Sequence, residues 1–134
     1  MRQRQIKEIM TTGVVTCNPD SSLDEVARLL SEAEISAVVV GSAEGKLEGI
    51  LSSFDLLQYF GKDLSQIRAV QIMRRDVASV LPTDLVEVAA QKMQEAHYHR
   101  LVVTNEDKSR AVGVISISDV IRTMWRDRDA LIEP

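Results

Sequence analysis

Two acidic side chains stand at the same place in two copies of one short pattern: glycine, two residues, serine, two residues, aspartate. The copies run from Gly49 to Asp55 and from Gly113 to Asp119. An ionised carboxylate three residues into a helix can accept two hydrogen bonds from a ribose diol. Free N–H groups at the start of that helix favour a phosphate nearby. The pattern therefore has chemistry that suits a sugar phosphate, and its candidate residues are Ser52, Asp55, Ser116 and Asp119.

The same pattern also has a purely structural interpretation. Serine followed three residues later by an acidic residue is close to an N-terminal capping box, in which the cap alone contributes about 1 kcal/mol. Capping by the serine and ligand binding by the aspartate can coexist, so both interpretations stay open.

A cluster of cations appears in one half of the chain only. His97-Tyr98-His99-Arg100 occupies the place that Glu34-Ile35-Ser36-Ala37 holds in the other half. Arginine can fork onto phosphate oxygens, and histidine adds a donor whose strength depends on pH. We expect a preference for a phosphorylated ligand; the alternative is that these cations simply follow a helix C-terminus, where positive charge is favoured.

Other reactive residues predict no catalysis and no metal site. Cys17 lies in an expected strand with no histidine close in sequence, which favours a buried small hydrophobe. His97 and His99 lack the cysteine or third histidine that would complete a zinc set. With no activated nucleophile or acid–base pair visible, we expect the protein not to be an enzyme.

The elements that position these residues are written twice along the chain. Ile9, Met10, Val14 and Pro19 recur in the same order and spacing as Ile72, Met73, Val77 and Pro82. Such self-similarity predicts two copies of one structural unit. We assign residues 1–62 to the first repeat and 63–134 to the second, with 61–66 as the linker.

Each repeat reads as β-α-β-β-α. In the first, we expect strands at 14–17, 37–40 and 47–51, a helix capped by Ser21 or Ser22, and a second helix from Ser52 to about Phe60. In the second, we expect strands from Val77, at 101–103 and at 111–115, with helices at 86–96 and from Ser116. The fold class is therefore α/β (α+β), and we expect the repeats to pack sheet to sheet about a pseudo-twofold axis because a lone unit buries little apolar area.

This element order, with a proline after the first strand and the Gly-x-x-Ser-x-x-Asp ending, resembles the CBS domain, which occurs in tandem pairs. The resemblance covers residues 6–124 and includes the run from His99 to Val103. It implies that adenosyl ligands such as AMP, ADP, ATP or S-adenosylmethionine bind between the repeats, with Asp55 and Asp119 on the ribose hydroxyls.

The resemblance also implies two unequal sites, because the aspartate of one repeat faces the adenine pocket of the other. One site would join Asp55 and Ser52 with Arg75, Val77, Tyr98, His99 and Arg100. The other would join Asp119 and Ser116 with Val14, Ile35 and Ser36, and has no obvious phosphate cation.

Composition sets the remaining expectations. The chain has 134 residues, of which 45% are hydrophobic, and a formal net charge of -4. That charge does not favour nucleic acid as a partner, and no apolar run approaches the roughly 20 residues of a membrane span. The cytoplasm is the expected compartment, because no apolar signal-peptide core is visible.

The function that we expect is regulatory: sensing of an adenine nucleotide, and hence of energy state, with no obligatory cofactor. The alternative is a ligand-free dimerisation or interaction module. By resemblance we expect a homodimer and a regulated protein that is reached in trans.

Overall fold

The computed structural model describes residues 3–131, which form two compact units. The first unit is Val14–Val77. The second unit consists of the N-terminal segment up to Gly13 together with the chain from Ala78 onward. Each unit has a hydrophobic core and a β-sheet of its own.

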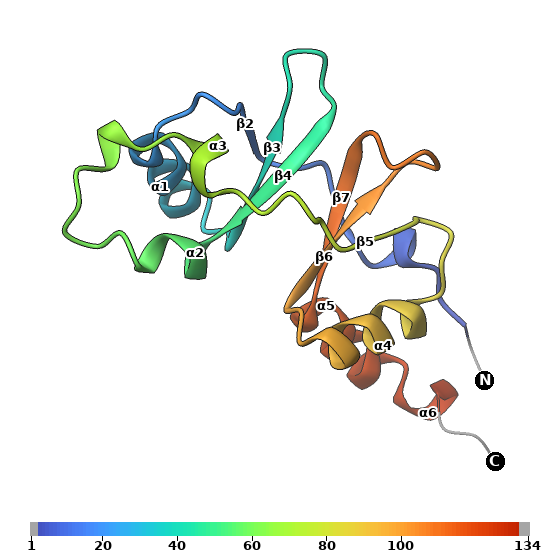
Figure 1. The fold of residues 1–134 in the computed structure, drawn as a ribbon. Coiled ribbons are helices and arrows are strands. Elements are labelled where there is room, and N and C mark those ends of the chain that lie inside the picture. Colours follow the sequence, from blue (N-terminus) through green and yellow to red (C-terminus); the bar gives the residue numbers. More distant parts are fainter. Residues whose placement is uncertain (1–2, 132–134) are drawn as a thin grey trace. The chain divides into compact units, whose positions relative to one another are not determined.

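The first unit is built on a sheet with strand order β2-β3-β4, in which β2 and β3 are parallel and β3 and β4 antiparallel (Figure 1). Its elements are β2 (Thr16–Cys17), α1 (Leu23–Glu32), β3 (Ala37–Gly41), β4 (Leu47–Ser52), α2 (Ser53–Leu57), the 3-10 turn η2 (Leu64–Gln66) and α3 (Ala69–Ile72). The Ser22 hydroxyl caps α1 by accepting from the N–H of Glu25. The apolar face of α1 then joins the core formed with β3 and β4.

The second unit repeats this plan and adds one strand. Its elements are η1 (Ile6–Glu8), β1 (Thr11–Thr12), β5 (Ser79–Val80), α4 (Val86–Ala96), β6 (Arg100–Thr104), β7 (Ala111–Ser116), α5 (Ile117–Arg126) and α6 (Arg128–Leu131). The strand order is β1-β7-β6-β5, with β1 antiparallel to β7. Ile6 is fully buried in this core, so the N-terminal segment is an integral part of the unit.

Each unit is completed by the segment that, in the sequence, opens the other repeat. Thr11 and Thr12 pair with Val114 and Gly113 on β7, although they precede the first repeat's strand. In the same way, Arg74 pairs with Ile50 of β4. The compact units therefore differ in composition from the repeats 1–62 and 63–134 read along the chain, and the assignment of those ranges as domains stays a prediction.

The predicted fold class and element order are confirmed. The helix at 86–96 and the cap at Ser22 are where the sequence placed them. The second helix of the first repeat is shorter than expected and ends at Leu57. The segment 61–66, predicted as the linker, contains η2 in its second half: the Asp63 side chain accepts from the N–H of Ser65, and Leu64 packs on the core.

Candidate functional site

Both aspartates of the repeated pattern stand at the third position of a helix and close a capping box. In the first unit, the Ser52 N–H donates to Asp55 Oδ2 at 2.9 Å, and the Asp55 N–H donates to Ser52 Oγ at 3.3 Å. In the second, Ser116 and Asp119 make the same two bonds at 2.8 and 3.3 Å. The capping interpretation is thus confirmed in both copies, and the cap fixes where each carboxylate lies.

The other carboxylate oxygen of each aspartate accepts from an arginine. Arg74 donates Nε and Nη2 to Asp55 Oδ1, at 3.0 and 2.9 Å. Arg122, one turn further along α5, donates Nη1 to Asp119 Oδ1 at 3.1 Å. The aspartates are equivalent in the sequence pattern, but their arginines come from different places in the fold.

Burial and hydrogen bonding act in opposite directions on Asp55. Burial on its own raises the pKa of this carboxyl, since it disfavours the charged form. The donors of Arg74 and Ser52 favour the charged form and prevail, so the pKa of Asp55 lies below its ordinary value. Asp55 is therefore a fixed anion at neutral pH and can act as a hydrogen-bond acceptor only.

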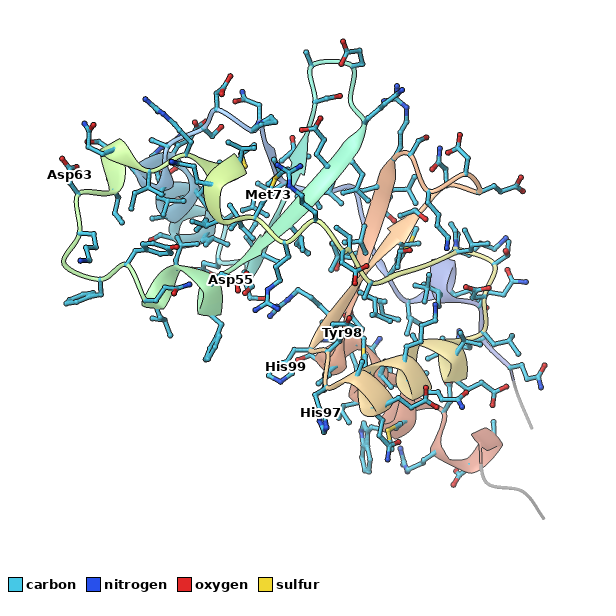
Figure 2. The ribbon with its side chains drawn as sticks, in the orientation of Figure 1. Asp55, Asp63, Met73, His97, Tyr98 and His99 are labelled. Atoms are coloured by element: carbon cyan, nitrogen blue, oxygen red, sulfur yellow. The ribbon has the colours of Figure 1, made fainter. Side chains whose placement is uncertain are left out.

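The predicted cations of the second unit follow the end of α4. Figure 2 shows His97, Tyr98 and His99 there, and His97 adopts a left-handed conformation with φ of 58° that ends the helix. The interpretation as residues after a helix C-terminus is confirmed in this respect. All three are exposed, and Arg100 is half-buried at the start of β6.

Within the second unit, this segment adjoins the start of α5. The carbonyl of His99 accepts from the N–H of Ile117 at 3.0 Å, and Arg100 is paired with Ser116 in the sheet. The predicted residues Ser116, Asp119, His99 and Arg100 therefore lie on neighbouring chain segments of one unit. The assignment of His99 and Arg100 to Asp55, which came from the resemblance, stays a prediction.

The first unit shows the same arrangement without cations. The Ser36 carbonyl accepts from the N–H of Ser53 at 2.8 Å, which brings exposed Ser36 to the start of α2 beside Ser52. Ile35 packs on the core. Three other predicted residues also belong to the first unit. Val14 and Val77, its first and last residues along the chain, are half-buried, and Arg75 is exposed.

Sequence reasoning missed both arginines that contact the aspartates. Arg122 follows Asp119 by three residues on one helix, a spacing that brings side chains together and could have identified it. Arg74 is nineteen residues from Asp55, and nothing in the sequence separates it from the neighbouring Arg75.

Two hollows lie on the second unit. A polar hollow of about 190 Å³ has Asp119 and Arg122 in its wall and is otherwise lined by Arg4, Glu8, Ile9, Thr123, Arg126 and Asp127. An apolar groove of about 240 Å³ lies between α4 and α5 and is lined by Ala90, Met93, Gln94, Ile117, Val120, Ile121 and Met124.

Three further findings concern reactive groups and membrane contact. Cys17 is buried, as expected of a small core residue, and burial raises the pKa of its thiol to about 11. Among residues 3–131, no group of three or more His, Cys, Asp or Glu side chains is placed to hold a metal ion. No helix in that described part is both long and apolar enough to cross a membrane.

Solved structures and curated relatives resemble this chain. A structure of the CBS domain pair of protein MJ0100 in complex with 5'-methylthioadenosine and S-adenosyl-L-methionine has a TM-score of 0.84 and 23% identity, covering 94% of this chain and 99% of that one. A structure of CBSX2 in complex with AMP has a TM-score of 0.80 and 22% identity, covering 92% and 98%. At these identities the likeness shows the fold.

One curated relative is homoserine O-acetyltransferase of Methanohalobium evestigatum, which is 29% identical over 117 residues. Those residues are 87% of this chain and 23% of the relative. The chain thus spans about a quarter of the length of the curated relatives that match it first. The sequence pattern of the family described as CBS domain matches residues 6–62 and 67–126. The chain belongs to the CBS domain family and carries two copies of that domain.

Proposed function

We propose that the chain is a regulatory module that binds an adenosyl ligand through Asp55, Asp119 or both. The observation that carries this proposal is the pair of capping boxes, which hold two carboxylates at matching places in the two units. A carboxylate fixed in this way can accept both hydroxyls of a ribose diol. The structures similar in fold contain 5'-methylthioadenosine, S-adenosylmethionine or AMP, and all three have that diol.

Supporting residues are assigned as predicted from the sequence. Ser52 and Ser116 hold the aspartates. Arg100 and Arg75 supply positive charge for a phosphate, and His99 adds a hydrogen-bond donor. Val14, Ile35, Ser36, Val77 and Tyr98 contact adenine. The chain then acts as a sensor without chemistry of its own, and its regulatory effect is exerted on a protein in trans.

Thermal melts with AMP, ADP, ATP and S-adenosylmethionine test the proposal. A ligand at 100 times its Kd stabilises a single site by about 2.7 kcal/mol, which is about 10 °C in Tm for a chain of this length. Asp55→Asn and Asp119→Asn each remove the negative charge and one of the two acceptor oxygens from one site. The remaining amide oxygen can still cap the helix. Asp63→Asn is the matched control, because it changes the same charge in the first unit away from α2.

The outcome assigns the site. Loss of the shift in only one of the two Asp→Asn variants identifies the aspartate that holds the ligand. Unchanged melts of the wild-type protein with all four ligands would refute adenosyl binding. Arg100→Ala tests the phosphate role separately, and wild-type affinity for AMP in that variant would remove Arg100 from the site.

A second candidate function is self-association, and the apolar groove between α4 and α5 favours it. Ile121, Met124 and Trp125 on α5 are 55%, 56% and 66% exposed, which is unusual for large apolar side chains side by side on one helix. We propose that a second copy of the chain covers this surface and forms a homodimer. An isologous dimer requires only that one such surface meet its copy.

Analytical ultracentrifugation tests the dimer. Ile121→Asp places a charge in the groove and is expected to give a monomer. Ser118→Asp is the control, since it adds the same charge on an exposed position of α5 outside the groove. A wild-type protein that is monomeric at every concentration, or an Ile121→Asp variant that stays dimeric, would exclude this surface.

A further inference from the structure

Arg74 occupies acceptor positions of Asp55 that the proposed ligand needs. A carboxylate offers about four lone-pair positions. Arg74 takes two of them on Oδ1, at 3.0 and 2.9 Å, and the Ser52 N–H takes one on Oδ2 at 2.9 Å. A ribose diol donates two hydrogen bonds. The ligand therefore cannot engage Asp55 fully unless Arg74 gives up at least one of its own.

The Arg74 side chain can leave while its backbone stays in place. The side chain is 64% exposed, whereas that of Asp55 is 9% exposed. The Arg74 backbone is held independently, since its N–H donates to the Ile50 carbonyl and its carbonyl accepts from the Ile50 N–H, both at 3.0 Å. Displacement therefore requires rotation of the side chain alone.

A displaced Arg74 retains its charge, because a guanidinium does not deprotonate in proteins. A phosphate oxygen is a close chemical equivalent of the carboxylate oxygen that Arg74 loses, and arginine can bind either with two N–H groups. A ligand that brings its own phosphate offers Arg74 a new anion. A neutral ligand offers none.

Asp119 is engaged differently, since the N–H and the hydroxyl of Ser116 both donate to its Oδ2, at 2.8 and 3.1 Å. Its arginine, Arg122, lies on the same helix and donates one N–H at 3.1 Å. Position 11, which pairs with β7 as Arg74 pairs with β4, is a threonine. The fork onto the carboxylate is thus a feature of the first unit.

We propose that Arg74 is a built-in competitor for the Asp55 carboxylate and makes this site selective for adenosyl ligands that carry an anionic group. The proposal rests on the proposed function, since it assumes that Asp55 binds the ribose. Selectivity arises because a neutral adenosyl ligand must displace Arg74 without compensation, whereas an anionic one exchanges one partner of Arg74 for another.

Calorimetric titration with adenosine and AMP tests the proposal, because the two probes differ only in the phosphate. Arg74→Gln is expected to bind adenosine more tightly and to lower the preference for AMP over adenosine by about tenfold, the size of one charge-assisted hydrogen bond. Arg74→Lys keeps the charge without the fork, and should tighten adenosine binding while retaining a preference for AMP. Arg28→Gln on α1 of the same unit, where the exposed Arg28 side chain pairs with Glu32, is the matched control and should behave as wild type.

A double-mutant cycle with Asp55→Asn shows whether Arg74 acts through Asp55. The effect of Arg74→Gln on adenosine binding should disappear in the Asp55→Asn background. If the wild-type protein binds both probes and Arg74→Gln leaves their ratio unchanged, the competitor role is refuted and adenosyl binding stands. If neither the wild-type protein nor any variant binds either probe, the proposed function fails and the competitor role fails with it.

Discussion

Gly49→Ala tests why a glycine opens the repeated pattern. Gly49 lies on β4, where the segment containing Met73 and Arg74 runs alongside (Figure 2). A Cβ at this position would stand 2.8 Å from Met73 Sδ and 2.9 Å from the Arg74 carbonyl oxygen. The sulfur can move, but the carbonyl is held by the N–H of Ile50. The glycine is required for space, since its φ lies outside the left-handed region.

The cost follows from these contacts. Adding one carbon to a well-packed site costs about 1–3 kcal/mol. If the segment moves away instead, the two backbone bonds between Ile50 and Arg74 weaken, at about 0.5–1.5 kcal/mol each. Either route predicts a loss of about 1–3 kcal/mol in the free energy of unfolding, or about 4–11 °C in Tm for a chain of this length that melts in one transition.

Urea unfolding and thermal melts followed by circular dichroism measure this loss. The control is Gly41→Ala on the neighbouring strand β3, where a Cβ would meet the Lys46 carbonyl oxygen at an ordinary 3.5 Å. That variant should be unchanged, or stabilised by about 0.4–1 kcal/mol through a less flexible unfolded chain. Gly113→Ala repeats the experiment in the second unit, where the Thr11 carbonyl oxygen lies 2.6 Å away. Equal stability of the Gly49→Ala and Gly41→Ala variants would refute the explanation by close approach.

Three further predictions concern stability, pH and reactivity. Ile6→Ala should lower the free energy of unfolding by about 2–5 kcal/mol in urea, because Ile6 is fully buried, while exposed Lys7→Ala should change it by less than about 0.5 kcal/mol. The pKa of Asp55 is lowered on folding, so the contribution of this carboxylate to stability is complete above its ordinary pKa and is lost as the pH falls through its value in the folded protein. Below about pH 4, the free energy of unfolding of the wild-type protein should therefore decline more steeply than that of Asp55→Asn in acid titrations. Cys17, with a buried thiol and a pKa of about 11, should react with a thiol reagent at pH 8 only as fast as the chain opens, and prompt labelling of the native protein would contradict its burial.

The repeat made most of the fold predictable. Proline after the first strand, a serine cap and a full amphipathic helix are each a local signal of secondary structure. The same order of elements in the second repeat supports the assignment made in the first. The elements that were missed are short: β1 has two residues, and α3 has four. Such segments complete less than two helical turns or one pleat, so they carry no periodic pattern, and their structure is set by the core that they cover.

The candidate site was predictable only as far as its local geometry. Ser52 and Asp55 interact within one helix turn, so their spacing in the sequence predicts their contact. Arg74 and Arg75 are adjacent residues of the same type, and in the structure Arg74 forms an isolated β-bridge while Arg75 begins a bend. Only the pairing of Arg74 with Ile50 decides which arginine meets Asp55, and that pairing is a long-range contact. The sequence therefore indicated a cation near this place and could not identify it.

The composition of the units explains why this arginine matters. The first repeat by itself, residues 1–62, contains Asp55 but neither Arg74 nor the buried Ala69 and Met73 that join its core. These arrive with the segment that opens the second repeat and belongs to the first unit. The environment of Asp55 is thus a product of both repeats, and so is its lowered pKa. Sequence symmetry predicts two equivalent carboxylates. The segment that completes the first unit brings Arg74 to Asp55, whereas the corresponding segment of the second unit has Thr11 at that place. The surroundings of the two aspartates are therefore chemically different.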